Sequence, residues 1–340
     1  KALARNKTDT AYRLLKTLLI QDPPVFNNSS DYNNLFQDIG DSLALARKLF
    51  PELLQLAPVD DYKDNIRSLL TWLVDSNYMK APDYAGYFAR LLFDAKIQLK
   101  KQQVKDEKQL QKKADDNDIA DHAESQESDG DVLEDYAMLL LPFYDEQQAV
   151  PEFFNKLLKS KDAVLRMHTA MLLLRTNKQV ADSIVQSLAA SDQYRSRLLK
   201  NLESIHREDQ FPARYRNQLD ITRSQLARNR GAEDFFAIEF VDKVIAQSKS
   251  EKGYVYFFRY KLNKDDDWQM GIGGLQPINL HEISSNDALV RLTNKKIKNG
   301  QPILEQFNVQ LRKLLFSKHK SAASYYLDND YYMGRGEDED

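Results

Sequence analysis

The chain has 340 residues, which is enough for about two to three domains and a sizeable core without metals or disulfides. Its net charge of -3 excludes a strongly basic nucleic-acid binder on global grounds, and the absence of cysteine excludes disulfides, thiolate metal sites and cysteine nucleophiles. No apolar run reaches the roughly 18 residues that a membrane span requires, so we expect no membrane span. Cysteine-free chains occur in reducing and oxidising compartments alike, so the sequence assigns no cellular location.

The distribution of glycine divides the chain into two parts. Three of the eleven glycines precede Arg230, and the other eight lie from Gly231 onward. Because helices disfavour glycine and turns favour it, we predict a domain boundary near Arg230. The predicted domains are an α-helical domain over residues 1–230, a small α+β module over residues 231–325 and an acidic, tyrosine-rich tail over residues 326–340.

Apolar residues recur at helical spacing through the first third of the chain. A first helix, with Thr8 at its start, ends at a pair of prolines, and a second helix is expected to break at Pro51. A later stretch, residues 84–99, places Leu91 and Ile97 on one apolar face. These stretches predict amphipathic helices of about three to five turns, separated by short breaks.

Two segments of the helical part echo each other. Their sequences are FPELLQLAPVDDYKDNIRSLLTWL and VPEFFNKLLKSKDAVLRMHTAMLLL, and each opens one apolar helix with Pro-Glu and a second helix with an aspartate, Asp64 or Asp162. Residues 151–202 resemble the HEAT and armadillo class of helical repeats, and residues 50–79 resemble it less closely. The resemblance implies antiparallel helix pairs in an α-solenoid-like stack, whose concave surface binds other proteins.

A charged insertion is predicted over residues 100–135. It begins with six lysines and continues as ADDNDIADHAESQESDGDVLED, in which every charged residue is acidic. Few of its residues can be buried, so we predict a solvated helix extension followed by a surface loop. An acidic segment that binds a partner is the alternative.

After Gly231 the apolar period changes from that of a helix to that of a strand. Aromatic residues alternate along GYVYFFRYKL, a third strand follows in DWQMGI, and a helix after Pro302 carries an apolar stripe that can cover one face of the sheet. The predicted fold class is therefore mainly α, with antiparallel, α-solenoid-like helix pairs followed by a C-terminal α+β module in which a helix packs on a small antiparallel sheet.

The glycine and aspartate cluster between the second and third of these strands invites a binding-site hypothesis. A dinucleotide fingerprint would need a third glycine where Gln276 stands, and a calcium loop beginning at Asn263 would have Trp268 in place of its turn glycine and Gly274 in place of its glutamate. The segment LNKDDDWQ is instead typical of a hairpin turn. We predict no cofactor here.

No catalytic or metal-binding constellation is visible in the sequence. His281 and Glu282 begin like a metalloprotease motif, but Ser285 occupies the position of the second histidine ligand. The five histidines do not cluster, and no G-x-S-x-G nucleophile elbow is present. We therefore predict no catalytic residues, no metal ligands and no enzymatic activity in this chain.

A basic cluster in the C-terminal module is the strongest electrostatic feature. Aromatic strands beside lysines suit single-stranded nucleic acid, yet the same lysines suit a solvated helix face, and no RNA-binding signature is present. The tyrosine face of the second strand either packs on the Pro302 helix or docks a partner. The possible interaction surface consists of Tyr254, Tyr256, Tyr260, Lys295, Lys296, Lys298, Arg312 and Lys313.

These features favour a noncatalytic protein-interaction or scaffold segment. Because Lys1 is neither an initiator methionine nor part of a signal peptide, we expect the C-terminal part of a larger protein. One alternative is an accessory region of an enzyme whose catalytic domain lies upstream. Another is binding of an anionic polymer or nucleic acid through the basic cluster. A protein partner is expected, and the sequence specifies neither its identity nor the oligomeric state.

Overall fold

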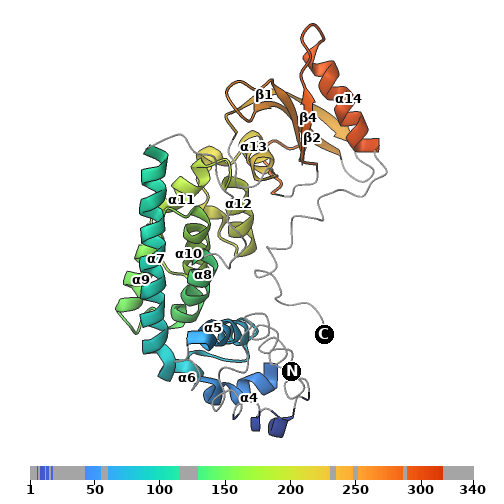
Figure 1. Cartoon of the computed structure of the whole chain (residues 1–340). Helices are drawn as coiled ribbons and strands as arrows, with labels where there is room; N and C mark the ends of the chain where they lie inside the picture. The colour runs from blue at the N-terminus through green and yellow to red at the C-terminus, as the bar shows by residue number, and fades with distance from the viewer. Residues whose placement is uncertain are drawn as a thin grey trace. The chain divides into compact units, whose positions relative to one another are not determined.

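A computed structural model describes residues 43–54, 60–114, 129–229, 235–247, 252–285 and 289–316, together with isolated positions between 6 and 17. The described part is mainly helical, and a four-stranded antiparallel sheet lies toward its C-terminal end (Figure 1). This confirms the predicted fold class. Among the described residues, no helix is long and apolar enough to cross a membrane.

The chain divides into two compact units. The first comprises residues 1–188 and 201–210, and the second comprises residues 189–200 and 211–340. This division differs from the predicted boundary near Arg230, because a helix that precedes this residue packs on the sheet. Of the predicted charged insertion, residues 115–128 lie outside the described residues, and so does the predicted tail.

The first unit is built from helices. In chain order they are α4 (Leu43–Leu53), α5 (Asp60–Asp75), α6 (Ala81–Tyr84), the 3-10 turn η3 (Ala85–Tyr87), α7 (Phe88–Ala114), α8 (Asp129–Leu140), η4 (Leu141–Phe143), α9 (Ala149–Leu157) and α10 (Ala163–Arg175). Two further helices, α11 (Asp182–Ala190) and α12 (Arg195–Ser204), contribute residues to both units. Pro51 lies inside α4, near its end, whereas the sequence predicted a break there.

Helix α8 occupies the centre of the first unit. It packs against α5, α7 and α10, and α9 packs against α7 and α10 (Figure 1). The contact between α7 and α8 is apolar, and the fully buried side chains that line the two helices are Leu91, Ala95, Leu99, Leu133, Ala137 and Leu140. Whether these helices form a true HEAT-like repeat stays a prediction.

A buried carboxylate fixes α7 to the turn between α9 and α10. The Asp106 carboxylate accepts hydrogen bonds from the Ser160 hydroxyl at 2.9 Å, the Lys161 backbone N–H at 2.9 Å and the Gln102 side-chain amide at 3.0 Å. The next residue, Asp162, caps α10 by accepting from two backbone N–H groups of the first turn, as its predicted place at the start of a helix implied. Four donors from the turn and its helix are thereby satisfied.

A buried arginine joins α5 to α8. The Arg67 guanidinium donates to Asp135 at 3.1 Å and to Asp64 at 2.6 Å, and it lies 5.5 Å from the centroid of the Tyr136 ring. Asp64 was expected to begin a helix, but α5 begins one turn earlier, at Asp60, and the carboxylate neutralises a buried cation instead. Pairing of this kind offsets the large cost of removing a guanidinium from water.

The second unit is a sheet covered on both faces. Its strand order is β1 (Ala237–Gln247), β2 (Lys252–Lys261), β3 (Gln269–Gln276) and β4 (Arg291–Lys296), all antiparallel, and β1 carries a bulge between Phe240 and Asp242. Helix α14 (Ile303–Phe316) covers one face, where Phe307 stacks on Phe257 with centroids 4.8 Å apart. Helix α13 (Gln218–Asn229) covers the other face, where Leu226 joins the aromatic side chains of β2.

The glycines of β3 bring α13 close to the sheet. A Cβ atom on Gly273 would lie 2.4 Å from Cγ2 of Thr222 on α13, a separation that no side chain tolerates. A Cβ atom on Gly271 would lie at ordinary contact distance from Leu226, 3.5 Å away. The close approach of α13 to the strand therefore explains why glycine occupies position 273.

Candidate interaction surfaces

The predicted tyrosine face is largely internal. Tyr256 and Tyr260 are only 4% and 2% exposed, and they pack with Leu226 of α13. This differs from the expectation that the face packs on the Pro302 helix, because the cluster that holds these tyrosines lies on the α13 side of the sheet. Tyr254 is half-buried, with the Lys243 ammonium 4.6 Å from its ring centroid. Of the three tyrosines, Tyr254 alone retains surface that a partner can contact.

Both buried hydroxyls have hydrogen-bond partners. Tyr256 donates to the side-chain carbonyl of Gln218 at 2.8 Å, and Tyr260 donates to the Thr293 carbonyl at 2.8 Å. Burial raises the pKa of Tyr256 to about 12, so its hydroxyl remains a donor at neutral pH. These hydroxyls therefore anchor the core of the second unit.

The predicted basic residues remain on the surface. Lys295 and Lys296 are exposed on the edge strand β4, Lys298 follows in the next turn, and Arg312 and Lys313 are exposed on α14. Whether these residues bind a partner stays a prediction.

The hairpin between β2 and β3 engages one of these lysines. The Lys296 ammonium lies 2.7 Å from the Asp267 carboxylate, and this hydrogen bond raises the pKa of Lys296 and lowers the pKa of Asp267. A second aspartate of the run, Asp266, accepts from the Asn263 backbone N–H at 2.8 Å. The described residues contain no group of three or more side chains placed to hold a metal ion. The DDD segment thus forms the predicted hairpin turn.

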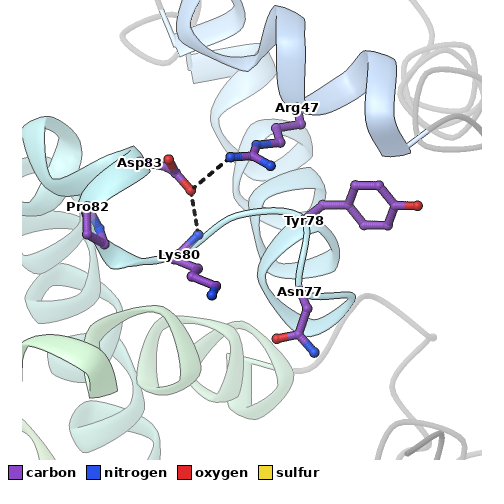
Figure 2. Close-up of a pocket in the computed structure, with 6 residues that line it drawn as sticks. All are labelled: Arg47, Asn77, Tyr78, Lys80, Pro82 and Asp83. Carbon is purple, nitrogen blue, oxygen red and sulfur yellow. Dashed lines mark hydrogen bonds and ion pairs between the residues drawn. The ribbon is translucent and has the colours of Figure 1, made fainter.

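A hollow of about 440 Å³ opens on the first unit, between α4 and the segment that links α5 to α6 (Figure 2). It is lined by Arg47, Asn77, Tyr78, Lys80, Pro82 and Asp83. Figure 2 shows that the Asp83 carboxylate accepts from the Lys80 backbone N–H at 2.8 Å and pairs with Arg47 at 3.8 Å. All six residues are exposed, and the one carboxylate already serves α6 as a cap. The one carboxylate of the hollow is therefore already engaged within the chain.

Helix α7 carries apolar side chains on its solvent side. Phe93, Ile97 and Val104 are 57%, 44% and 43% exposed. At about 100° of rotation per residue, they lie within about 40° of one line, and this line runs opposite the buried residues Leu91 and Ala95. We call this surface the outer stripe of α7. It corrects the expectation that Ile97 shares the buried face with Leu91.

Lysines surround the outer stripe. Lys96 and Lys101 lie about 60–80° to either side of it, and Lys100 lies nearly on its line, between Ile97 and Val104. All three lysines are exposed. At one end of the stripe, the Arg90 guanidinium donates to Asp94 at 2.7 Å and lies 5.9 Å from the centroid of the Phe93 ring. The surface thus has three exposed apolar side chains along its line, interrupted by Lys100, and a lysine on each side of that line.

A second surface is a loop of the second unit, residues 277–285, which buried glutamines hold in place. The Gln218 side-chain amide donates to the carbonyls of Pro277, Asn279 and Glu282 at 2.8, 3.1 and 2.8 Å. Gln276 accepts from the Ser284 backbone N–H at 2.9 Å and donates to the Ser284 carbonyl at 3.0 Å. The loop exposes the apolar side chains of Ile278 and Leu280.

The edge strand β1 provides a third exposed apolar surface. Phe240 and Ile245 pair with residues of β2 that face α13, yet both are exposed, because α13 contacts the other three strands more closely than β1. Phe236, just before the strand, is exposed as well. The sequence of this strand does not show that its apolar residues remain uncovered.

Three surfaces of the described residues thus combine exposed apolar side chains with a firmly held framework. They are the outer stripe of α7, the loop at residues 277–285 and the edge of β1. On α7 and β1, sequence periodicity could not distinguish these residues from core residues, since both kinds are apolar residues at the spacing of the element. Comparison of the chain with protein families, with curated proteins and with solved structures found no match.

Proposed function

We propose that this chain is a noncatalytic protein-interaction segment, and that the outer stripe of α7 is its principal docking surface. The observation that carries the proposal is the alignment of Phe93, Ile97 and Val104 opposite the core face of one long helix. Exposed apolar residues scattered singly are normal, but an aligned set is typical of a contact surface.

The stripe has enough apolar surface to contribute to binding. Full burial of a large apolar side chain stabilises by about 1.5–3 kcal/mol, so covering these three half-exposed side chains would contribute about 1 kcal/mol each. Aromatic residues are enriched among the side chains that dominate binding energy, and Phe93 is the most exposed member of the stripe. Contacts around the stripe would supply the remaining affinity.

The framework beneath the stripe supports the same proposal. The buried apolar residues of α7 pack against α8, and Asp106 ties the helix to the turn before α10. A docking surface on a helix held in this way loses little conformational freedom when a partner binds. The binding energy is then available for affinity rather than for ordering the surface.

Site-specific photo-crosslinking tests the proposal. A photoreactive amino acid replaces Ile97 in the full-length protein, expressed in the cells from which the gene comes, and a matched version replaces Lys156, which is exposed on α9. We expect Ile97 to give discrete protein adducts that Lys156 does not give. Adducts that are the same at both positions, or absent from both, would contradict the proposal.

A further inference from the structure

We infer that the segment that docks on the outer stripe of α7 is an amphipathic α-helix whose apolar residues are bordered by acidic residues. This inference rests on the proposed function, since it names the chemistry of the partner for that same surface. It follows from the spacing of the apolar residues on α7, from the charges around them and from the state of the α7 backbone.

The spacing of the stripe suits a helix. Phe93, Ile97 and Val104 are four and seven residues apart, so they form a nearly straight ridge about 16 Å long. A second helix that crosses at a small angle buries such a ridge between its own side chains. An extended strand would need unpaired backbone groups to bond with, whereas the N–H and C=O groups of a helix interior such as this part of α7 already bond to one another.

The charges around the stripe select an acidic partner. Lys96 and Lys101 stand on its two sides, Lys100 interrupts it, and Glu107 is an exposed acid near its far end. A helix that places glutamate or aspartate beside its apolar ridge would set opposite charges against these three ammonium groups. Complementary flanking charges set the choice and orientation of partners in helix pairs.

The same charges disfavour a second copy of the chain. Two α7 helices packed along their outer stripes would bring Lys96, Lys100 and Lys101 of one copy close to those of the other, and like charges in close contact oppose association.

The lysines also distinguish the stripe from a membrane-binding helix, whose apolar face is broad. Here Lys100 lies nearly in the line of the apolar residues, and the opposite side of α7 is already buried in its own unit.

Binding of designed peptides to the full chain tests the inference. The first peptide is a helix with leucines at the spacing of the stripe and glutamates at its borders, and the second has lysines in place of those glutamates. We expect saturable binding of the acidic peptide, measured by fluorescence anisotropy, and affinity for the basic peptide that is weaker by about tenfold or more. Affinity for the acidic peptide should fall as salt is raised.

Variants locate the binding. Ile97→Asp should lower the affinity for the acidic peptide by about tenfold or more, since it puts a like charge into the apolar ridge. The double variant Lys96→Glu, Lys101→Glu should reverse the preference, so that the basic peptide binds better than the acidic one. The control Lys156→Glu changes an exposed lysine on α9 and should bind like the unmodified chain. All these side chains are exposed, so melting temperatures should match and exclude unfolding as the cause.

Several results would overturn the inference. Equal affinity for the two peptides, or no binding of either, would remove the acidic helix as partner. Binding to vesicles of anionic lipid that Ile97→Asp abolishes, without binding of the acidic peptide, would instead identify a membrane surface. A concentration-dependent dimer that Ile97→Asp disrupts would identify a second copy. Adducts from Ile97 without peptide binding would leave the proposed function standing, whereas failure of both experiments would remove both.

Discussion

Glycine at position 273 makes room for a helix rather than for a ligand. The sequence presented Gly271, Gly273 and Gly274 as a possible phosphate loop, and the missing third glycine argued against it. The structure explains why position 273 is glycine, because Thr222 of α13 occupies the space that a side chain at this position would need. Nothing in the sequence could name α13 as the element that approaches this strand.

Substitution of this glycine tests the close approach. Gly273→Ala should destabilise the second unit by about 1–3 kcal/mol, because the new Cβ atom overlaps Cγ2 of Thr222. Adding Thr222→Ser removes that methyl group, so the double variant should be more stable than Gly273→Ala alone. Urea-induced unfolding measures both changes.

The control for this experiment is Gly86→Ala. A Cβ atom on Gly86 meets nothing within 4 Å and the residue lies in a helical turn, so the change should not destabilise the chain and should stabilise it by about 0.4–1 kcal/mol. Equal stability of Gly273→Ala and Gly86→Ala would show that α13 does not approach the sheet as described.

Buried Asp106 joins α7 to the turn between α9 and α10. Asp106→Asn keeps one acceptor oxygen, which can still face Ser160 and Lys161, since both bond to the same carboxylate oxygen. It replaces the oxygen that accepts from Gln102 by an amide group and removes the charge that strengthens all three hydrogen bonds, so it should cost about 1–3 kcal/mol. The adjacent variant Glu107→Gln changes an exposed acid and should stay within about 0.5 kcal/mol. Thermal unfolding of the two variants compares them directly, and a melting temperature for Asp106→Asn no lower than that of Glu107→Gln would refute the assignment.

At the scale of the element, α7 shows why sequence periodicity predicted the helix but not its surface. The apolar residues of α7 occupy two opposite sides, and residues of one side cannot be recognised as exposed when both sides are apolar. Apolar spacing alone therefore groups Ile97 with Leu91, although the two residues are six positions apart and point in different directions around the helix. A helical projection of α7 separates the two residues, but only the packing of α8 decides which side of α7 is buried.

Helix α13 shows the opposite case. Its buried residues include Gln218, Thr222, Ser224 and Gln225, so the sequence has little apolar periodicity although the helix is a principal part of the second core. The loop after β3 turns its carbonyls toward the two buried glutamines, Gln218 and Gln225, and the Ser224 hydroxyl accepts from the Ser196 backbone N–H. Polar partners from distant parts of the chain replace the apolar signal on which sequence analysis depends.

At the scale of the whole molecule, the fold class could be predicted, whereas the limits of its units could not. The change from helical to strand periodicity after Gly231 correctly identified the antiparallel sheet. The boundary near Arg230 followed glycine content, yet residues 189–200 and 211–229 belong with the sheet. Helical segments that pack on a sheet look like neighbouring helices in sequence, and the contacts that assign them are long-range.

The surface expected from the sequence and the surface proposed from the structure are of the same kind but lie in different units. The expected surface combined aromatic and basic residues in the second unit, where Tyr256 and Tyr260 are internal. The surface that we propose combines apolar and basic residues on α7, in the first unit. Both follow the same physical idea, that exposed apolar area bordered by charge serves recognition. The two surfaces differ in burial, which local sequence does not determine: Tyr256 and Tyr260 are buried, whereas the apolar side chains of the outer stripe are exposed.

The central claim is that the outer stripe of α7 is open in the isolated chain and covered in the native assembly. Carbene footprinting of Phe93, Ile97 and Val104 measures this directly, in the purified chain and in the assembly isolated from its own cells. We predict strong labelling in the purified chain and much weaker labelling in the assembly, while exposed Lys156 and Lys159 label equally in both. Equal labelling of the stripe in the two samples would contradict the claim.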